Sequence, residues 1–183
     1  MDDGVRAESE LERRVLQDPR WLRGAAWGRP RRGHPEGSVG AHVAQVLKNL
    51  DAAALDPASR RKLRLVALFH DIAKADVDRK RPRSGSNHHA ARARVFASDY
   101  VQDLDVLELI ELHDEGYNAW AAGARRGDWT AATARARRLT ARLGNRLPLY
   151  LAFYRADNDA PGKTQASLSW FERLCATSTS RPR

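Results

Sequence analysis

The stretch Leu65-Val66-Ala67-Leu68-Phe69-His70-Asp71-Ile72-Ala73-Lys74 decides how this chain folds. Its apolar run predicts a buried segment, yet the run ends on two adjacent ionisable residues, His70 and Asp71. An isolated carboxylate is very unfavourable in apolar surroundings, so a buried aspartate is normally paired, neutralised or ligated. An imidazole beside a carboxylate supplies half of a transition-metal site. A bound metal ion is therefore the simplest explanation for this pair.

The regions around this stretch predict an all-α fold. Apolar residues recur at three- and four-residue intervals, and no segment sustains a two-residue alternation. Ser38 and Asp56 are good N-caps, and Pro57 is favoured at the first helical position. The residues between the first helix and Gly33 are basic and are expected to be irregular. The predicted helices cover 8–17, 38–54, 57–71, 89–100, 106–122, 129–143, 147–159 and 166–174.

The length of 183 residues predicts one domain with a core of its own. We expect residues 1–35 to form an N-terminal helix and a basic approach segment packed on the core. Residues 36–176 would form the helical core, and residues 177–183 a disordered tail.

The single cysteine, Cys175, excludes an internal disulfide and a zinc site made of thiolates alone. No apolar stretch approaches the roughly 20 residues that span a bilayer, and the acidic start is unlike a secretory signal. These features predict a cytoplasmic protein without membrane contacts. The formal net charge of +9 indicates either a phosphate-binding surface or a bias in composition, and the sequence leaves both open. The oligomeric state is also open.

Several ionisable residues lie on the apolar faces of the predicted helices. One histidine on such a face is more often a hydrogen-bonded core residue than a metal ligand. Several of them from different helices would leave a bundle core with many polar groups to satisfy, and one metal would satisfy them together. The residues are His42, His70, His113 and Asp157.

Their order, a helical histidine, a His-Asp pair, further histidines and a distant helical aspartate, resembles the HD-domain superfamily of metal-dependent phosphohydrolases. The resemblance runs from Glu36-Gly37-Ser38-Val39-Gly40-Ala41-His42 through Ala67-Leu68-Phe69-His70-Asp71-Ile72-Ala73-Lys74 to Phe153-Tyr154-Arg155-Ala156-Asp157. It implies a single-domain helical bundle of the HD type. It also implies that one metal is held by His42, His70, Asp71 and Asp157.

The resemblance further implies a second metal, held by His113 and by His88 or His89, with Asp71 bridging the two ions. The residues leave open which of His88 and His89 faces the site, because a helix start here can be phased either way. A solvated helix start is the alternative for these two histidines. The second His-Asp pair, His113-Asp114, ranks below the first as the signature because no lysine follows it.

Histidine and carboxylate ligands suit a divalent manganese, iron, cobalt, nickel or zinc ion, one or two per chain. Such an ion would activate a water molecule to attack phosphorus, so a serine or cysteine nucleophile is not required. Asp71, as a shared ligand, and Lys74 are the predicted catalytic residues.

Four residues are predicted to contact the substrate. Lys74 lies one helical turn after His70 and can reach a phosphate, although a lysine at a helix end also interacts favourably with the helix dipole. Arg81 and Arg83 belong to a basic loop and could clamp a phosphate, or could simply be solvated. Tyr117 could stack on a base, or could belong to the core.

These residues predict a phosphatase or phosphodiesterase that acts on a nucleotide or an RNA end, so its partner would be a phosphorylated small molecule or a nucleic-acid end. A non-catalytic metal- and nucleotide-binding regulatory module is one alternative, and an Arg-rich helical RNA-binding protein is another. The triplet Gly162-Lys163-Thr164 resembles the end of a P-loop, but Asp157 stands where that motif requires glycine. A kinase is therefore excluded.

Overall fold

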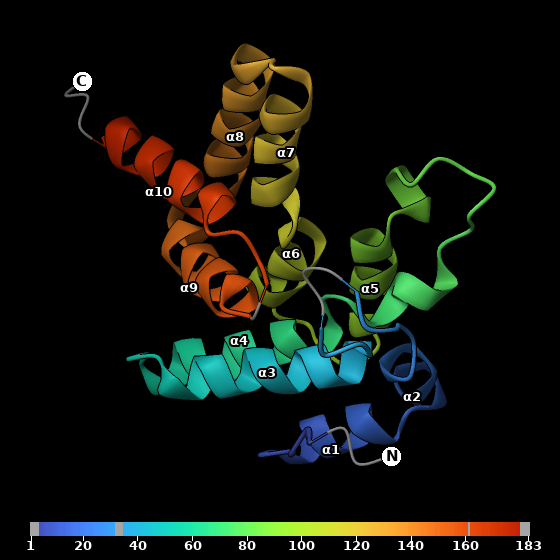
Figure 1. Ribbon diagram of the computed structural model, residues 1–183. Helices are drawn as coiled ribbons and strands as arrows, with labels where there is room; N and C mark the ends of the chain where they lie inside the picture. Colours follow the sequence, from blue (N-terminus) through green and yellow to red (C-terminus); the bar gives the residue numbers. More distant parts are fainter. Residues whose placement is uncertain (1–3, 32–34, 161, 180–183) are drawn as a thin grey trace.

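The computed structural model describes residues 4–31, 35–160 and 162–179 (Figure 1). Every named element in these ranges is helical, which confirms the all-α prediction. No helix in them is long and apolar enough to cross a membrane. The α-helices are α1 (Glu10–Gln17), α2 (Pro19–Ala25), α3 (Val39–Ala52), α4 (Pro57–Phe69), α5 (His89–Ala97), α6 (Leu104–Leu112), α7 (Glu115–Arg126), α8 (Trp129–Leu143), α9 (Leu147–Asn158) and α10 (Ala166–Thr179). The 3-10 helices are η1 (Ile72–Asp76), η2 (Gly85–Asn87) and η3 (Gly144–Arg146).

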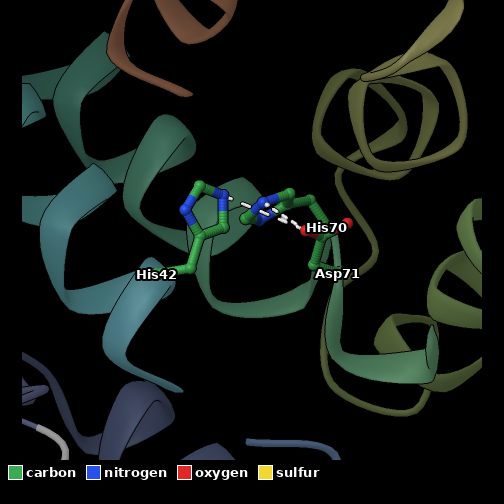
Figure 2. A group of neighbouring side chains, drawn as sticks. All are labelled: His42, His70 and Asp71. Carbon is green, nitrogen blue, oxygen red and sulfur yellow. Dashed lines mark ion pairs between the residues drawn. The ribbon is translucent and has the colours of Figure 1, made fainter. Parts of the chain in front are cut away.

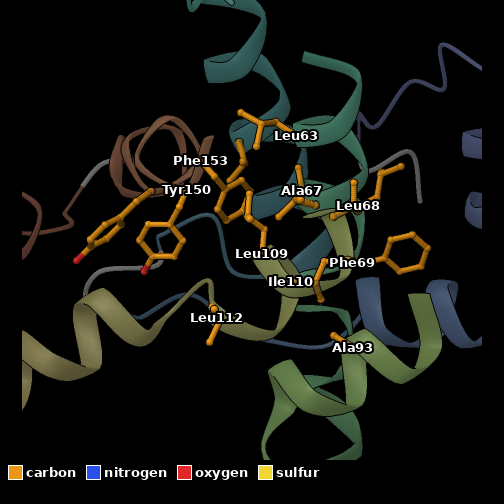
Figure 3. Packing of buried hydrophobic residues seen from close by; sticks show 14 of the residues in the cluster. Leu63, Ala67, Leu68, Phe69, Ala93, Leu109, Ile110, Leu112, Tyr150 and Phe153 are labelled. Atoms are coloured by element: carbon orange, nitrogen blue, oxygen red, sulfur yellow. The ribbon is translucent and has the colours of Figure 1, made fainter. Parts of the chain in front are cut away.

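Helix α4 lies at the centre of the bundle. It contacts α3, α5, α6 and α9, while α7, α8 and α10 pack together at one end of the molecule (Figure 1). The last turn of α4, from Val66 to Phe69, is buried on all sides: Phe69 packs toward α5, and Ala67 faces the layer formed by Leu109 and Phe153 (Figure 3). A helix that is apolar all round must be covered by its neighbours. The apolar run therefore places its own end, His70 and Asp71, deep inside the fold.

The predicted N-caps are confirmed. The Ser38 hydroxyl accepts a hydrogen bond from the Ala41 amide (3.1 Å), and the Asp56 carboxylate accepts from the amides of Ala58 and Ser59 (2.9 and 3.0 Å). These side chains satisfy amides that have no partner within the helix. The two caps fix where α3 and α4 begin. These starting points place His42 in α3 and His70 at the end of α4 so that both side chains point inward.

The single helix predicted over 106–122 is wrong, because the chain breaks at His113 and Asp114 into α6 and α7. The buried Tyr150 hydroxyl holds the break: it accepts from the Gly116 amide (2.9 Å) and donates to the His113 carbonyl oxygen (3.2 Å). A Cβ at Gly116 would lie 2.9 Å from the Tyr150 hydroxyl oxygen, so α7 can approach α9 only with glycine here.

The prediction also differs from the structure at the end of α4, at the end of α5, which is Ala97, and before Gly33. Helix α4 ends at Phe69, so the helix predicted to run through 71 stops two residues earlier and η1 follows. The stretch before Gly33 was predicted to be irregular but contains α2, which Asp18 caps through the Arg20 amide (2.7 Å) with Pro19 at its first position.

Helix α2 packs on the core through Trp21, whose indole nitrogen donates to the Leu68 carbonyl oxygen (2.9 Å). At the other end of the chain, α10 extends through Thr179 into the segment predicted as a tail, and residues 180–183 lie outside the described part. The division of the chain at residues 35 and 176 stays a prediction.

Candidate metal centre

The predicted metal ligands converge on one site although they come from different helices. His42 points in from α3, His70 and Asp71 follow α4, and Asp157 lies on α9 (Figure 2 shows the first three). The His42 Nε2 atom lies 2.8 Å from Asp157 Oδ1 and 3.9 Å from Asp71 Oδ2. The His70 Nε2 atom lies 3.5 Å from Asp71 Oδ2 and 3.7 Å from Asp157 Oδ1. Ligand atoms that each lie about 2.1 Å from one metal ion are separated from each other by distances similar to these.

His70 presents an unsatisfied lone pair to these carboxylates. Its Nδ1 lies 2.9 Å from the Ala67 carbonyl oxygen, so this nitrogen carries the proton and donates it. Its Nε2 is buried and has no hydrogen-bond partner among the described residues. Burial lowers the pKa of His70 to about 3, so the ring is neutral. A buried acceptor without a donor is costly, and a metal ion would satisfy it, so these residues fit the metal.

His113 repeats this arrangement at the end of α6. Its Nδ1 lies 2.8 Å from the Ile110 carbonyl oxygen, three residues earlier, just as His70 contacts Ala67. Its Nε2 lies 3.4 Å from Asp71 Oδ1 and 3.2 Å from His89 Nε2. Two imidazole lone pairs do not face each other at that distance unless a proton or a metal ion lies between them.

A proton takes that place in the metal-free protein. Burial disfavours the charged ring of His113, but its hydrogen bond to Asp71 and the charge of Asp114 outweigh burial and raise its pKa to about 9. Burial lowers the pKa of His89, which therefore remains the neutral partner.

Asp71 lies between two groups of candidate ligands, one formed by His42, His70 and Asp157 and the other by His89 and His113. Its Oδ2 faces His42 and His70, whereas its Oδ1 lies 3.4 Å from both His89 Nε2 and His113 Nε2. This placement fits the bridging role that the resemblance implied for Asp71.

The neighbouring histidines His88 and His89 turn toward different partners. His89 is the first residue of α5 and turns toward Asp71, while His88 precedes the helix in extended backbone and turns toward Asp114, with Nε2 and Oδ2 3.4 Å apart. His88, His89 and Asp114 also lie close enough together to form a cation-binding group. Of the two neighbours, only His89 reaches both Asp71 and His113.

A lysine ammonium contacts each of the two carboxylates, the buried Asp71 and the half-buried Asp157. Lys74 Nζ donates to Asp71 Oδ2, and Lys163 Nζ donates to Asp157 Oδ1 (3.0 Å) and to the Asp157 carbonyl oxygen (2.6 Å). Burial opposes ionisation of the two carboxyl groups, yet these lysines hold the pKa of Asp71 and of Asp157 well below the usual range. The ammonium groups thus balance charge that a metal ion would otherwise balance.

Sequence reasoning missed Lys163. In the sequence it stands in a triplet that resembles the end of a P-loop, but its position six residues after Asp157, beyond a turn, allows it to fold back onto that carboxylate.

A cavity of about 510 Å³ opens beside this centre. Its described lining includes Lys74, Lys163 and Tyr117. Lys74 and Tyr117, two of the four predicted substrate contacts, therefore face the same space. The other two do not: Arg81 and Arg83 are exposed on their loop and are absent from the described lining.

The fold and the site together define an all-α protein with histidine and aspartate groups able to bind divalent metal. A family model of the HD domain matches residues 39–151, more than half of the chain, and the chain therefore belongs to the HD-domain family, within the superfamily of metal-dependent phosphohydrolases. The match includes His42, Asp71 and His113 but ends before Asp157, which the fold brings to the site. Searches of curated proteins and of solved structures found no match.

Proposed function

We propose that this protein is a phosphatase or phosphodiesterase that cleaves a phosphate ester of a nucleotide or an RNA end. The observation that carries the proposal is the buried, unpartnered His70 Nε2, which faces two ionised carboxylates at the wall of an open cavity. A structural metal site is closed, whereas a catalytic one keeps a position for water or substrate.

A divalent ion held by His42, His70, Asp71 and Asp157, with a second at His89 and His113, would activate water and polarise a phosphoryl oxygen. Manganese, iron, cobalt, nickel and zinc all suit these ligands. The chain itself supplies orientation, because the Ala67 and Ile110 carbonyl groups fix both histidine rings with Nε2 pointing inward. Outer hydrogen bonds of this kind set the tautomer and the ring orientation of metal ligands.

The two lysines would bind the substrate phosphate. Both line the cavity, and both ammonium groups lie within hydrogen-bond distance of a metal-ligating carboxylate. A phosphate at the metal would therefore lie within reach of Lys74 and Lys163, whose charges stabilise the negative charge on the phosphoryl oxygens. The cavity volume lies within the range of small-molecule sites. Tyr117 at its wall offers a ring on which a base could stack.

Phosphate release from generic and nucleotide esters, with each of the five metals in turn, tests the proposal. We expect activity with at least one metal, and we expect His70→Asn and Asp71→Asn to remove it while circular dichroism and the unfolding transition stay cooperative. Full activity in both variants would contradict the mechanism.

Two other results would favour the alternatives. Metal and nucleotide binding without turnover of any ester would indicate a regulatory module. Failure to retain any of the metals, together with steeply salt-dependent RNA binding, would indicate an Arg-rich RNA-binding protein.

A further inference from the structure

A second hollow, of about 530 Å³, adjoins the metal centre on the side of α8. Gly85 and His88 line one wall, Glu115 lies at the start of α7, and Arg135, Arg138 and Arg142 come from α8. We call this hollow the arginine groove. Its wall residues differ from those of the cavity beside Asp71, so it is a separate surface feature.

The three α8 arginines share one face because they are three and four residues apart. Glu115 holds Arg135 at 2.7 Å, and Glu108 and Glu111 hold Arg142 at 2.8 and 3.0 Å. These pairs keep two guanidinium groups in place along the groove. Arg138 is exposed and forms no ion pair among the described residues, so its charge is available to an anion from solution.

The loop that leads to Gly85, a residue of the opposite wall, also carries positive charge. It carries Arg79, Lys80, Arg81 and Arg83, all exposed and without an ion pair in the described part of the chain. Cations without acidic partners therefore lie on α8 and on the segment that leads to the facing wall. Such charge attracts a polyanion more than a single small anion, because several phosphates can be contacted at once.

The groove is next to the metal centre. His88 lines the groove and contacts Asp114 (3.4 Å), and Asp114 with His89 lines the cavity. A chain whose terminal phosphate lay between Lys74 and Lys163 could thus continue past His88 toward Arg138. The described groove wall contains three arginines but no Phe, Tyr or Trp, so it offers contacts to backbone phosphates more than base stacking.

We propose that the arginine groove binds the backbone of a single-stranded nucleic acid whose terminal phosphate enters the metal centre. This proposal rests on the proposed function and narrows it, because the favoured substrate becomes an oligonucleotide end and not a free nucleotide. Arg138 is the residue expected to contact a phosphate directly.

The test compares Arg138→Glu with Arg137→Glu, a matched charge reversal at the next residue of α8, which is exposed but does not line the groove. The substrates are a short RNA with a 3′-terminal phosphate and the 3′-mononucleotide of its last base.

We expect the wild-type kcat/KM to be higher for the RNA. Arg138→Glu should lower the kcat/KM for RNA by roughly tenfold, as loss of one charged hydrogen bond predicts. It should leave mononucleotide hydrolysis unchanged and reduce the salt slope of RNA binding by about one. Arg137→Glu should leave kcat/KM unchanged for both substrates.

Equal effects of the two variants, or no preference of the wild type for RNA, would overturn the groove proposal while leaving phosphohydrolase activity intact. Displacement of RNA by polyglutamate at the same concentration would also overturn it, in favour of an acidic protein partner. If neither these two substrates nor the generic and nucleotide esters are hydrolysed with any metal, the proposed function fails instead. Fluorescence anisotropy of labelled RNA then still tests the groove: weaker binding only in Arg138→Glu supports it, and equal binding in both variants rejects it.

Discussion

At the scale of single residues, the site depends on two histidines placed in the same way. His70 and His113 each follow the last residue of a helix and donate from Nδ1 to a carbonyl group three residues back. An aspartate follows each of them, but the two aspartates differ in their surroundings. Asp71 contacts both groups of candidate ligands, whereas Asp114 contacts only the second, through His89 (3.8 Å), and also contacts His88 (3.4 Å).

The difference between the adjacent histidines His88 and His89 gives a direct prediction. Replacing His89 with alanine removes a ligand from the second group, so its metal affinity should fall by roughly tenfold or more. His88→Ala should leave the affinity nearly unchanged because its ring faces Asp114. Calorimetric titration of the metal-free variants with Mn²⁺ measures both values. An equal loss in the two variants would show that His88 also binds the metal.

Lys163 should affect metal binding and catalysis in opposite directions. Its ammonium hydrogen-bonds Asp157, so in the metal-free protein it competes with an incoming cation for that carboxylate. Lys163→Met should therefore raise Mn²⁺ affinity, while kcat/KM falls because a phosphate contact is lost. Titration and steady-state kinetics measure the two effects separately. Lys48→Met, at an exposed position of α3, is the control and should change neither value; lower metal affinity in Lys163→Met would contradict this role of Lys163.

At the scale of elements, the sequence predicted those helices whose signals are local. Ser38, Asp56 and Pro57 mark the starts of α3 and α4, and the continuous apolar run marks α4 as central. The break between α6 and α7 was missed because the Tyr150 hydroxyl that holds it lies 34 residues after Gly116. Helix α2 was missed for another reason: its local signal, Asp18 followed by Pro19, was present, but the basic composition around it suggested a loop.

The same contrast between local signals and contacts of distant elements applies to the candidate metal centre. Helical spacing predicted inward faces for the histidines and Asp157. The fold buries His42, His70 and His113 and leaves Asp157 half-buried beside His42, since such faces are set by local periodicity. The choice between His88 and His89, and the contact between Lys163 and Asp157, depend on how separate elements pack, which one sequence does not reveal.

The contact of α2 with η1 links the N-terminal region to the metal centre. A Cβ at Gly24 would lie 2.1 Å from the Ile72 carbonyl oxygen, so Gly24→Ala must displace backbone directly after Asp71. We expect a loss of about 1–3 kcal/mol in the free energy of unfolding, typical of overpacking, together with weaker metal binding. Denaturant unfolding and metal titration measure the two effects. Arg23→Ala, an exposed neighbour in α2, should change both values little, and normal stability of Gly24→Ala would contradict the packing.

At the scale of the whole molecule, the centre gathers buried charge from helices that are distant in sequence. Asp71 and Asp157 remain ionised in the interior because Lys74 and Lys163 balance them. The candidate ligands come from α3, α5 and α9 as well as from the ends of α4 and α6, so the complete set exists only in the folded chain. Metal binding must therefore stabilise the fold as a whole, because the unfolded chain offers no comparable site.

Metal removal should accordingly lower the melting temperature. At a free metal concentration of about 100 times Kd, the linkage adds about 2.7 kcal/mol to the free energy of unfolding. For a chain of this length each kcal/mol shifts Tm by about 2–4 °C, so Mn²⁺ should raise Tm by roughly 5–10 °C and EDTA should reverse the shift. Calorimetric scans with and without the metal measure it. Asp71→Asn lacks the shared ligand and should show a much smaller shift, while Arg137→Glu should respond as the wild type does. A shift of equal size in Asp71→Asn would mean that the stabilising metal binds elsewhere.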